Sequence, residues 1–100
     1  MSSSFDPKPK RKKVDYEALQ SPLNRIPGMD LPTVRDLIDL GIQEVDELRG
    51  RSPEAIFEDI LNKNEQTPPD RLFSIRMATY YAETSDPDPA LLHPWKWQGQ

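Results

Sequence analysis

Residues 23–34 restrict the fold of this 100-residue chain more than any other stretch, because they specify a helix, a tight turn and a second helix. Leu23 and Ile26 are three residues apart, which places both on one face of a short helix. Pro27 and Gly28 follow directly, and both residue types favour a sharp reversal of the chain. The sequence therefore predicts a helical hairpin at this position.

The second helix of the hairpin is predicted to cover about residues 32–40. The Asp30 carboxylate can accept hydrogen bonds from the free N–H groups of a helix start, and Pro32 suits the first helical turn. Gly41 is expected to end the helix, because glycine tolerates the left-handed conformation found there. The apolar face of this helix consists of Val34, Leu37 and Ile38.

This order of residues resembles the helix-hairpin-helix motif, in which two apolar positions precede Pro-Gly and a second helix follows. The resemblance implies an all-α fold and a hairpin whose backbone contacts a nucleic-acid phosphate. The matching positions are Leu23, Ile26, Pro27, Gly28, Met29, Val34, Leu37, Leu40, Gly41 and Ile42.

Helical patterns continue on both sides of the hairpin. A first helical region is expected over residues 16–26 with a break near Gln20, and a short helical turn over residues 43–49. Ser52 and Pro53 then supply a hydroxyl cap and a favourable first residue for the next helix.

The last long helix is predicted to begin with a capping box formed by Thr67 and Asp70. In residues 72–82, apolar side chains occur on nearly all sides of the predicted helix. Such a helix is typical of the buried centre of a small bundle. No segment alternates with a period of two, so no sheet is expected. The predicted fold class is all-α, a five-helix, helix-hairpin-helix-like (SAM-like) bundle.

Further motifs are similar in order to those of a small bacterial family called pathogenicity locus proteins, some of which are described as mitomycin-resistance proteins. The resemblance implies a helix-hairpin-helix fold and a loose link to DNA or DNA damage, and it implies no reaction. The residues that carry it are Leu40-Gly41-Ile42, Leu48-Arg49-Gly50, Ser52-Pro53-Glu54, Arg76, Tyr80-Tyr81-Ala82, Pro89, Leu91-Leu92 and Trp95-Lys96-Trp97.

Charge divides the chain into a basic arm and an acidic domain. Residues 1–13 hold five cations and one acid, a net charge of 5 − 1 = +4, and the remainder holds 8 Lys/Arg and 16 Asp/Glu, a net charge of 8 − 16 = −8. We predict a disordered arm over residues 1–14 and a helix-hairpin-helix-like domain over residues 15–100. The arm could be a DNA-binding or nuclear-localisation patch, or only a solubilising tail. Its cations are Lys8, Lys10, Arg11, Lys12 and Lys13.

The hairpin departs from the phosphate-binding pattern at two positions. Asp30 stands where the motif has a second glycine, and Pro32 stands where a cation is usual. A carboxylate repels an anion, and proline offers neither an N–H group nor a charge. The hairpin could therefore be only a folding element. If it binds DNA, the expected contact residues are Arg25, Gly28, Met29, Asp30 and Arg35.

Trp95 and Trp97 flank Lys96 near the C-terminus, and two roles are consistent with this pattern. They could form a stacking platform for bases, or they could anchor the C-terminus on the bundle. His93 is the only histidine and has no neighbours with metal-ligand spacing. The sequence predicts no catalytic residue, no metal site and no cofactor, hence no enzyme.

Two functions are consistent with the sequence. The first, which we favour narrowly, is weak association with DNA without sequence preference. In this function the basic arm supplies the affinity and the hairpin contacts a backbone phosphate. The second is a protein-interaction module that uses the same scaffold and a degenerate hairpin. No membrane segment, secretory signal or small-molecule site is evident, so a cytoplasmic protein is expected.

Overall fold

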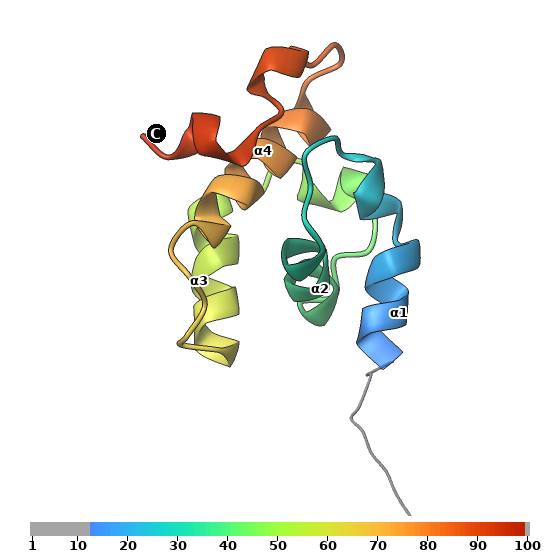
Figure 1. Cartoon of the computed structure of the whole chain (residues 1–100), viewed down its shortest axis with the longest axis vertical. Helices are drawn as coiled ribbons and strands as arrows, with labels where there is room; N and C mark the ends of the chain where they lie inside the picture. The colour runs from blue at the N-terminus through green and yellow to red at the C-terminus, as the bar shows by residue number, and fades with distance from the viewer. Residues whose placement is uncertain (1–12, 100) are drawn as a thin grey trace, which may run out of the picture.

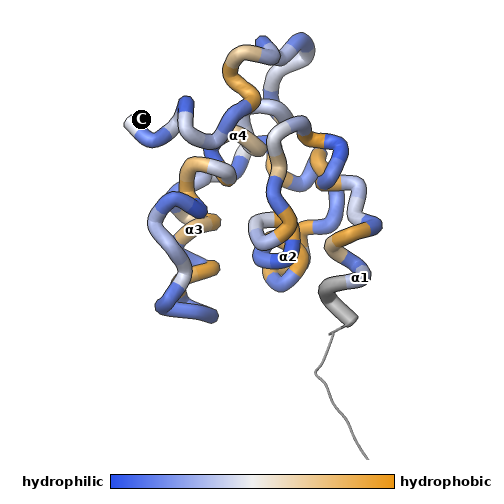
Figure 2. Tube along the Cα trace, in the orientation of Figure 1, coloured by the Kyte–Doolittle hydropathy of each residue, from blue (hydrophilic) through white to orange (hydrophobic). Residues whose placement is uncertain are grey.

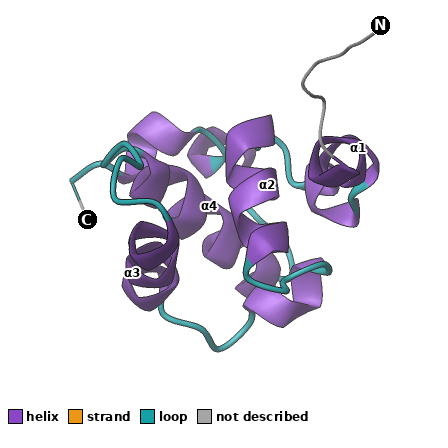
Figure 3. Cartoon of the chain, turned by 90° about the horizontal axis from the view of Figure 1, so that it is seen from below, coloured by secondary structure: helices purple, strands orange, loops and turns teal. Residues whose placement is uncertain are grey.

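The computed structural model describes residues 13–99, with side chains from residue 16 onward. The regular secondary structure of this part of the chain consists of helices alone (Figure 1, Figure 3). It contains four α-helices and four short 3₁₀ helices. In chain order they are α1 (Lys13–Gln20), η1 (Pro22–Arg25), α2 (Leu31–Asp39), η2 (Val45–Leu48), α3 (Pro53–Lys63), α4 (Arg71–Glu83), η3 (Pro89–Leu91) and η4 (Pro94–Trp97).

The all-α class is confirmed, and the prediction of five helices is wrong. The described residues hold four α-helices. The short helical turn predicted over residues 43–49 is present as the 3₁₀ helix η2, which extended residues at Glu44 and Arg49 bound on both sides. The first helix starts at Lys13, two residues before the predicted start of the domain. It breaks as expected after Gln20, where the Ser21 hydroxyl accepts a hydrogen bond from the Leu23 N–H at 3.0 Å and starts η1.

The C-terminal end of α2 forms as its sequence predicts. Gly41 has a φ of +86°, which an L side chain rarely adopts. The Gly41 N–H donates to the Ile38 carbonyl at 2.8 Å and the Ile42 N–H donates to the Leu37 carbonyl at 2.9 Å. These bonds satisfy helix-end carbonyls and turn Ile42 into the core.

The start of α4 differs from the predicted capping box. Asp70 is helical and makes no side-chain cap, while the Thr67 hydroxyl donates to the Asn64 carbonyl at 2.7 Å. Backbone carbonyls of Pro68 and Pro69 instead accept from the first N–H groups of the helix. These backbone bonds take the place of the predicted capping box.

Two helical pairs build the domain: α1 lies against α2, and α3 lies against α4 (Figure 1, Figure 3). The view in Figure 3 places α4 between α2 and α3, so the predicted central position of α4 is confirmed. Figure 2 shows the hydrophobic residues of α3 on the side that faces the rest of the domain. The core residues are Ala18, Leu23, Ile26, Val34, Leu37, Ile42, Leu48, Ile56, Ile60, Ile75, Met77, Ala78 and Leu92.

The turn between η1 and α2 lies at the upper end of Figure 1, and the turn between α3 and α4 lies at the lower end. The chain after α4 stays in the upper part of this view and packs there. Within the described residues, no helix combines the length and the apolar character that a membrane crossing requires.

Trp97 attaches the C-terminal segment to α4. Its ring lies against Tyr80 with centroids 5.2 Å apart, and its indole N–H donates to the Leu91 carbonyl at 2.8 Å. Arg76 of α4 donates from Nη1 to the Trp97 carbonyl at 2.8 Å and from Nε to the Glu54 carboxylate of α3 at 3.2 Å. The anchoring role predicted for a C-terminal tryptophan is confirmed for Trp97.

Trp97→Ala should lower the free energy of unfolding by about 3 kcal/mol, because it removes a large packed ring and leaves the Leu91 carbonyl without its donor. Trp95→Ala is the matched control, since that side chain is exposed, and it should change stability by less than about 0.5 kcal/mol. Urea unfolding followed by circular dichroism measures both. Equal losses in the two variants would contradict the anchoring role of Trp97.

Candidate functional site

The hairpin turn, residues 26–30, is the site that the sequence singles out. The Met29 N–H donates to the Ile26 carbonyl at 3.2 Å and closes the turn, and Gly28 has a φ of +82°. Ile26 is buried and Met29 is half-buried against the core. The turn is therefore firmly packed on its inner side.

Gly28 is needed for a contact within the protein. A Cβ atom built on Gly28 would lie 2.4 Å from the Leu92 carbonyl oxygen and 3.2 Å from the Met77 sulfur. The backbone of the C-terminal segment therefore occupies the space that the missing side chain leaves. In phosphate-binding hairpins a glycine allows a ligand to approach closely, and here it allows the protein's own chain to do so.

The Asp30 carboxylate uses both of its oxygens inside the domain. Oδ1 accepts from the Thr33 N–H at 2.9 Å and from the Thr33 hydroxyl at 2.6 Å, which caps α2. Oδ2 accepts from the Ser74 hydroxyl of α4 at 3.0 Å. Thr33 is fully buried and Ser74 is 3% exposed, so both need such a partner. A carboxylate thus occupies the helix start where an anion would bind.

The remaining predicted contact residues come from different elements around the turn. Arg25 is exposed at the end of η1, and Arg35 is half-buried one helical turn into α2. Pro32 is exposed in the first turn of α2. Of the arm cations, Lys8, Lys10, Arg11 and Lys12 lie outside the described residues, and Lys13 is the first residue of α1.

An ion pair between Asp36 and Arg71 joins α2 to α4 next to the turn. Burial raises the pKa of Asp36, and the Arg71 guanidinium counteracts part of that shift. The ion pair neutralises the charge of Arg71 within the protein.

The C-terminal segment presents a second aromatic side chain beside the turn. Trp95 is 60% exposed, with the His93 ring stacked on it at 5.7 Å between centroids and the Lys96 Nζ 4.9 Å from its ring centroid. The 3₁₀ turn of η4 separates the two tryptophans, so that Trp97 faces α4 and Trp95 faces solvent. The division between anchoring and exposed tryptophans could not be assigned from the sequence.

The surface of the domain has several hollows, one of which lies beside the turn. This hollow, of about 470 Å³, lies between the turn, the start of α4 and η4, and we call it the Trp95 hollow. Asp70, Phe73, Ser74 and Gln98 were not predicted as site residues. They are far in sequence from the hairpin turn, and only the packing of α4 and η4 brings them beside it. The lining residues are Asp30, Pro32, Asp70, Arg71, Phe73, Ser74, Pro94, Trp95 and Gln98.

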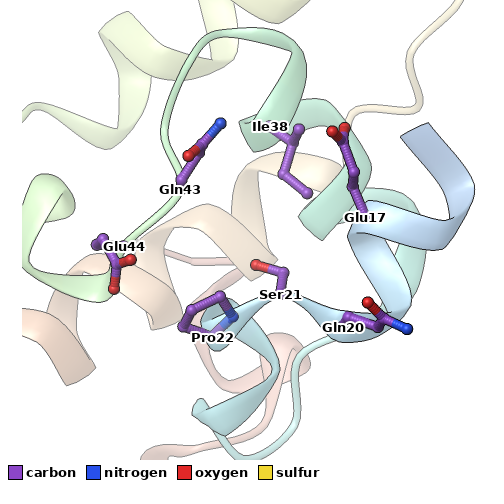
Figure 4. Close-up of a pocket in the computed structure, with 7 residues that line it drawn as sticks. All are labelled: Glu17, Gln20, Ser21, Pro22, Ile38, Gln43 and Glu44. Carbon is purple, nitrogen blue, oxygen red and sulfur yellow. The ribbon is translucent and has the colours of Figure 1, made fainter. Parts of the chain in front are cut away.

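A further hollow, of about 250 Å³, lies between α1, η1, α2 and the chain before η2 (Figure 4). Glu17 comes from α1 and Glu44 from the chain opposite, so two carboxylates border an apolar floor that includes Ile38. Among the described residues, no group of three or more His, Asp or Glu side chains could hold a metal ion. Each of these two hollows is acidic and partly apolar.

The family resemblance noted in the sequence is confirmed by comparison with protein families. The pathogenicity locus family matches residues 17–100, which is nearly all of the domain. The chain belongs to this family. No curated protein and no solved structure matches this pathogenicity locus protein significantly.

Gly28→Ala should destabilise the protein by about 3 kcal/mol, since the new Cβ would both occupy a left-handed conformation and collide with the Leu92 carbonyl. Gly41→Ala is the matched control. Gly41 has almost the same φ but no atom within 4 Å of its Cβ position, so only the conformational cost of about 1 kcal/mol is expected. Thermal unfolding of both variants tests the difference; a difference of zero would mean that the Leu92 contact is unimportant.

Asp30→Ala should cost about 2 kcal/mol of stability, because α2 loses its cap and the buried Ser74 hydroxyl loses its acceptor. Ser74→Ala removes only the bond to α4 and should cost about 1 kcal/mol. Chemical denaturation of the two variants and of the double variant measures the coupling. Additive losses in the double variant would show that the bond between Asp30 and Ser74 contributes no stability.

Proposed function

We propose that this pathogenicity locus protein is a protein-interaction module whose acidic domain binds a basic segment of a partner protein. The observation that carries the proposal is the Asp30 carboxylate, which occupies the start of α2 and bonds to Thr33 and Ser74. A phosphate at that position would meet a negative charge and an N–H group that is already used. The turn is therefore better suited to joining α2 and α4 than to holding DNA.

The charge of the domain supports the same proposal. Residues 14–100 carry 8 − 16 = −8, and this charge attracts a basic chain and repels a polyanion at long range. Several cations are also paired inside the domain, among them Arg71 with Asp36 and Arg76 with Glu54. Few cations remain for phosphate contacts.

The succession of α1, η1, the tight turn and α2 supports a helix-hairpin-helix relationship for the scaffold. In this proposal the scaffold is retained and the phosphate-binding use of its hairpin is lost. The link to DNA damage or mitomycin resistance that the family resemblance implies belongs to the second candidate function.

The second candidate is association with DNA through the basic arm. It is favoured by the five cations between Lys8 and Lys13, which are separate in sequence from the acidic domain. Such contacts would be electrostatic and independent of sequence. The arm and the domain would then have different partners.

The two candidates are separated by titrating the full chain with labelled duplex DNA and with a labelled lysine-rich peptide at several salt concentrations. A second protein carries glutamine at all five arm cations. We expect this variant to lose duplex binding and to keep peptide binding, which should weaken as salt rises. Any duplex binding by the unaltered chain should release no more than about five counterions.

Asp30→Gly combined with Pro32→Lys, made in the arm-neutralised chain, is the control for the hairpin. We expect no gain in duplex affinity, since the hairpin does not face DNA in this proposal. Tighter duplex binding by this folded variant, or peptide binding by neither protein, would contradict the proposal.

A further inference from the structure

We propose that the Trp95 hollow binds a lysine or arginine side chain of the partner's basic segment. This inference rests on the proposed function and assigns it a site. The hollow brings together three segments that are distant in the chain: the hairpin turn, the start of α4 and η4. Its volume of about 470 Å³ accommodates a long side chain together with adjacent backbone.

The walls of the hollow suit the aliphatic stem and the flat head of a basic side chain. Pro32, Phe73 and Pro94 supply apolar surface from the three segments. Trp95 is 60% exposed at the rim, whereas most large apolar side chains of the domain are packed. An exposed indole attracts a cation over its face and covers the stem that carries it.

The charge of the hollow favours a cation over an anion. Among the described residues, the Asp70 carboxylate makes no hydrogen bond or ion pair, so it is available to an incoming ammonium or guanidinium group. The Asp30 carboxylate adds a second negative charge, although both of its oxygens are already bonded. Arg71 is the cation of the lining, and its charge is paired with Asp36.

The protein already shows that Trp95 accepts a cation. The Lys96 Nζ lies 4.9 Å from the centroid of the Trp95 ring, within the range of a cation–π contact. Because Lys96 is exposed, it can move aside for a cation of the partner. A nucleic-acid base could also stack on the indole, but its phosphates would lie close to Asp30 and Asp70.

The hollow in Figure 4 can be compared with the Trp95 hollow, because both are lined by carboxylates. It is also bordered by two carboxylates, Glu17 and Glu44, but no aromatic side chain lines it. A site defined by charge alone would use either hollow. A site defined by an aromatic face together with a carboxylate uses the Trp95 hollow and not the hollow in Figure 4.

The test measures binding of a fluorescein-labelled peptide of alternating arginine and glycine to the full chain by fluorescence anisotropy. Trp95→Ala and Asp70→Asn should each weaken binding about tenfold. The first variant removes the aromatic face and the second removes the carboxylate that bind the cation. Glu44→Gln removes the same charge from the other hollow and should weaken binding less than about twofold. Trp95→Phe retains an aromatic face and should restore most of the affinity. Trp95 and Asp70 are exposed and Asp70 makes no cap, so these variants should keep the fold, which circular dichroism checks.

Each alternative result has a separate meaning. Equal, small losses in the Trp95, Asp70 and Glu44 variants would overturn the site and leave the acidic module in place. No binding of the peptide by the unaltered chain would overturn the proposed function itself. Tighter, Trp95-dependent binding of single-stranded oligothymidine than of the peptide would replace the basic side chain with a nucleic-acid base and overturn the inference.

Discussion

The domain depends on the hydrogen bonds of one carboxylate. Asp30 caps α2 through Thr33 and reaches α4 through Ser74, so a single side chain fixes both the start of one helix and its position against another. The buried hydroxyl groups of these two partners would otherwise be left without acceptors. On the neighbouring side of the turn, Gly28 admits the backbone of Leu92. Three segments of the chain therefore meet at one tight turn, and the turn must keep its shape for all of them to pack.

In this arrangement the Pro-Gly hairpin serves packing within the domain. The features that allow a hairpin to hold a phosphate are a glycine without a side chain and a helix start with unused N–H groups. In this protein the space at Gly28 is filled by the C-terminal segment and the helix start is capped by Asp30. The same backbone geometry thus supports packing within the domain. In our proposal, recognition shifts to the neighbouring surface, where η4 presents Trp95 to solvent and holds Trp97 against α4.

Charge separates the chain into parts with opposite preferences. The arm is basic and the domain is acidic, and in a small protein such a division favours different partners for each part. The ion pair of Asp36 and Arg71 leaves the net charge of the domain unchanged, but it occupies a cation near the turn. Trp95 beside the Asp70 carboxylate then gives the acidic domain a local feature that overall charge alone does not provide.

The sequence by itself determined the features that depend on a few neighbouring residues. Ser52 and Asp30 cap helices, and Gly41 ends one, because each bond joins groups within a few positions of the chain. Tertiary structure alone decided the features that join distant segments. The bond from Asp30 to Ser74 spans 44 residues, and the approach of Leu92 to the turn brings the end of the chain back to its first third. Caps are fixed by local backbone geometry, whereas these contacts exist only after the helices have packed around a common core.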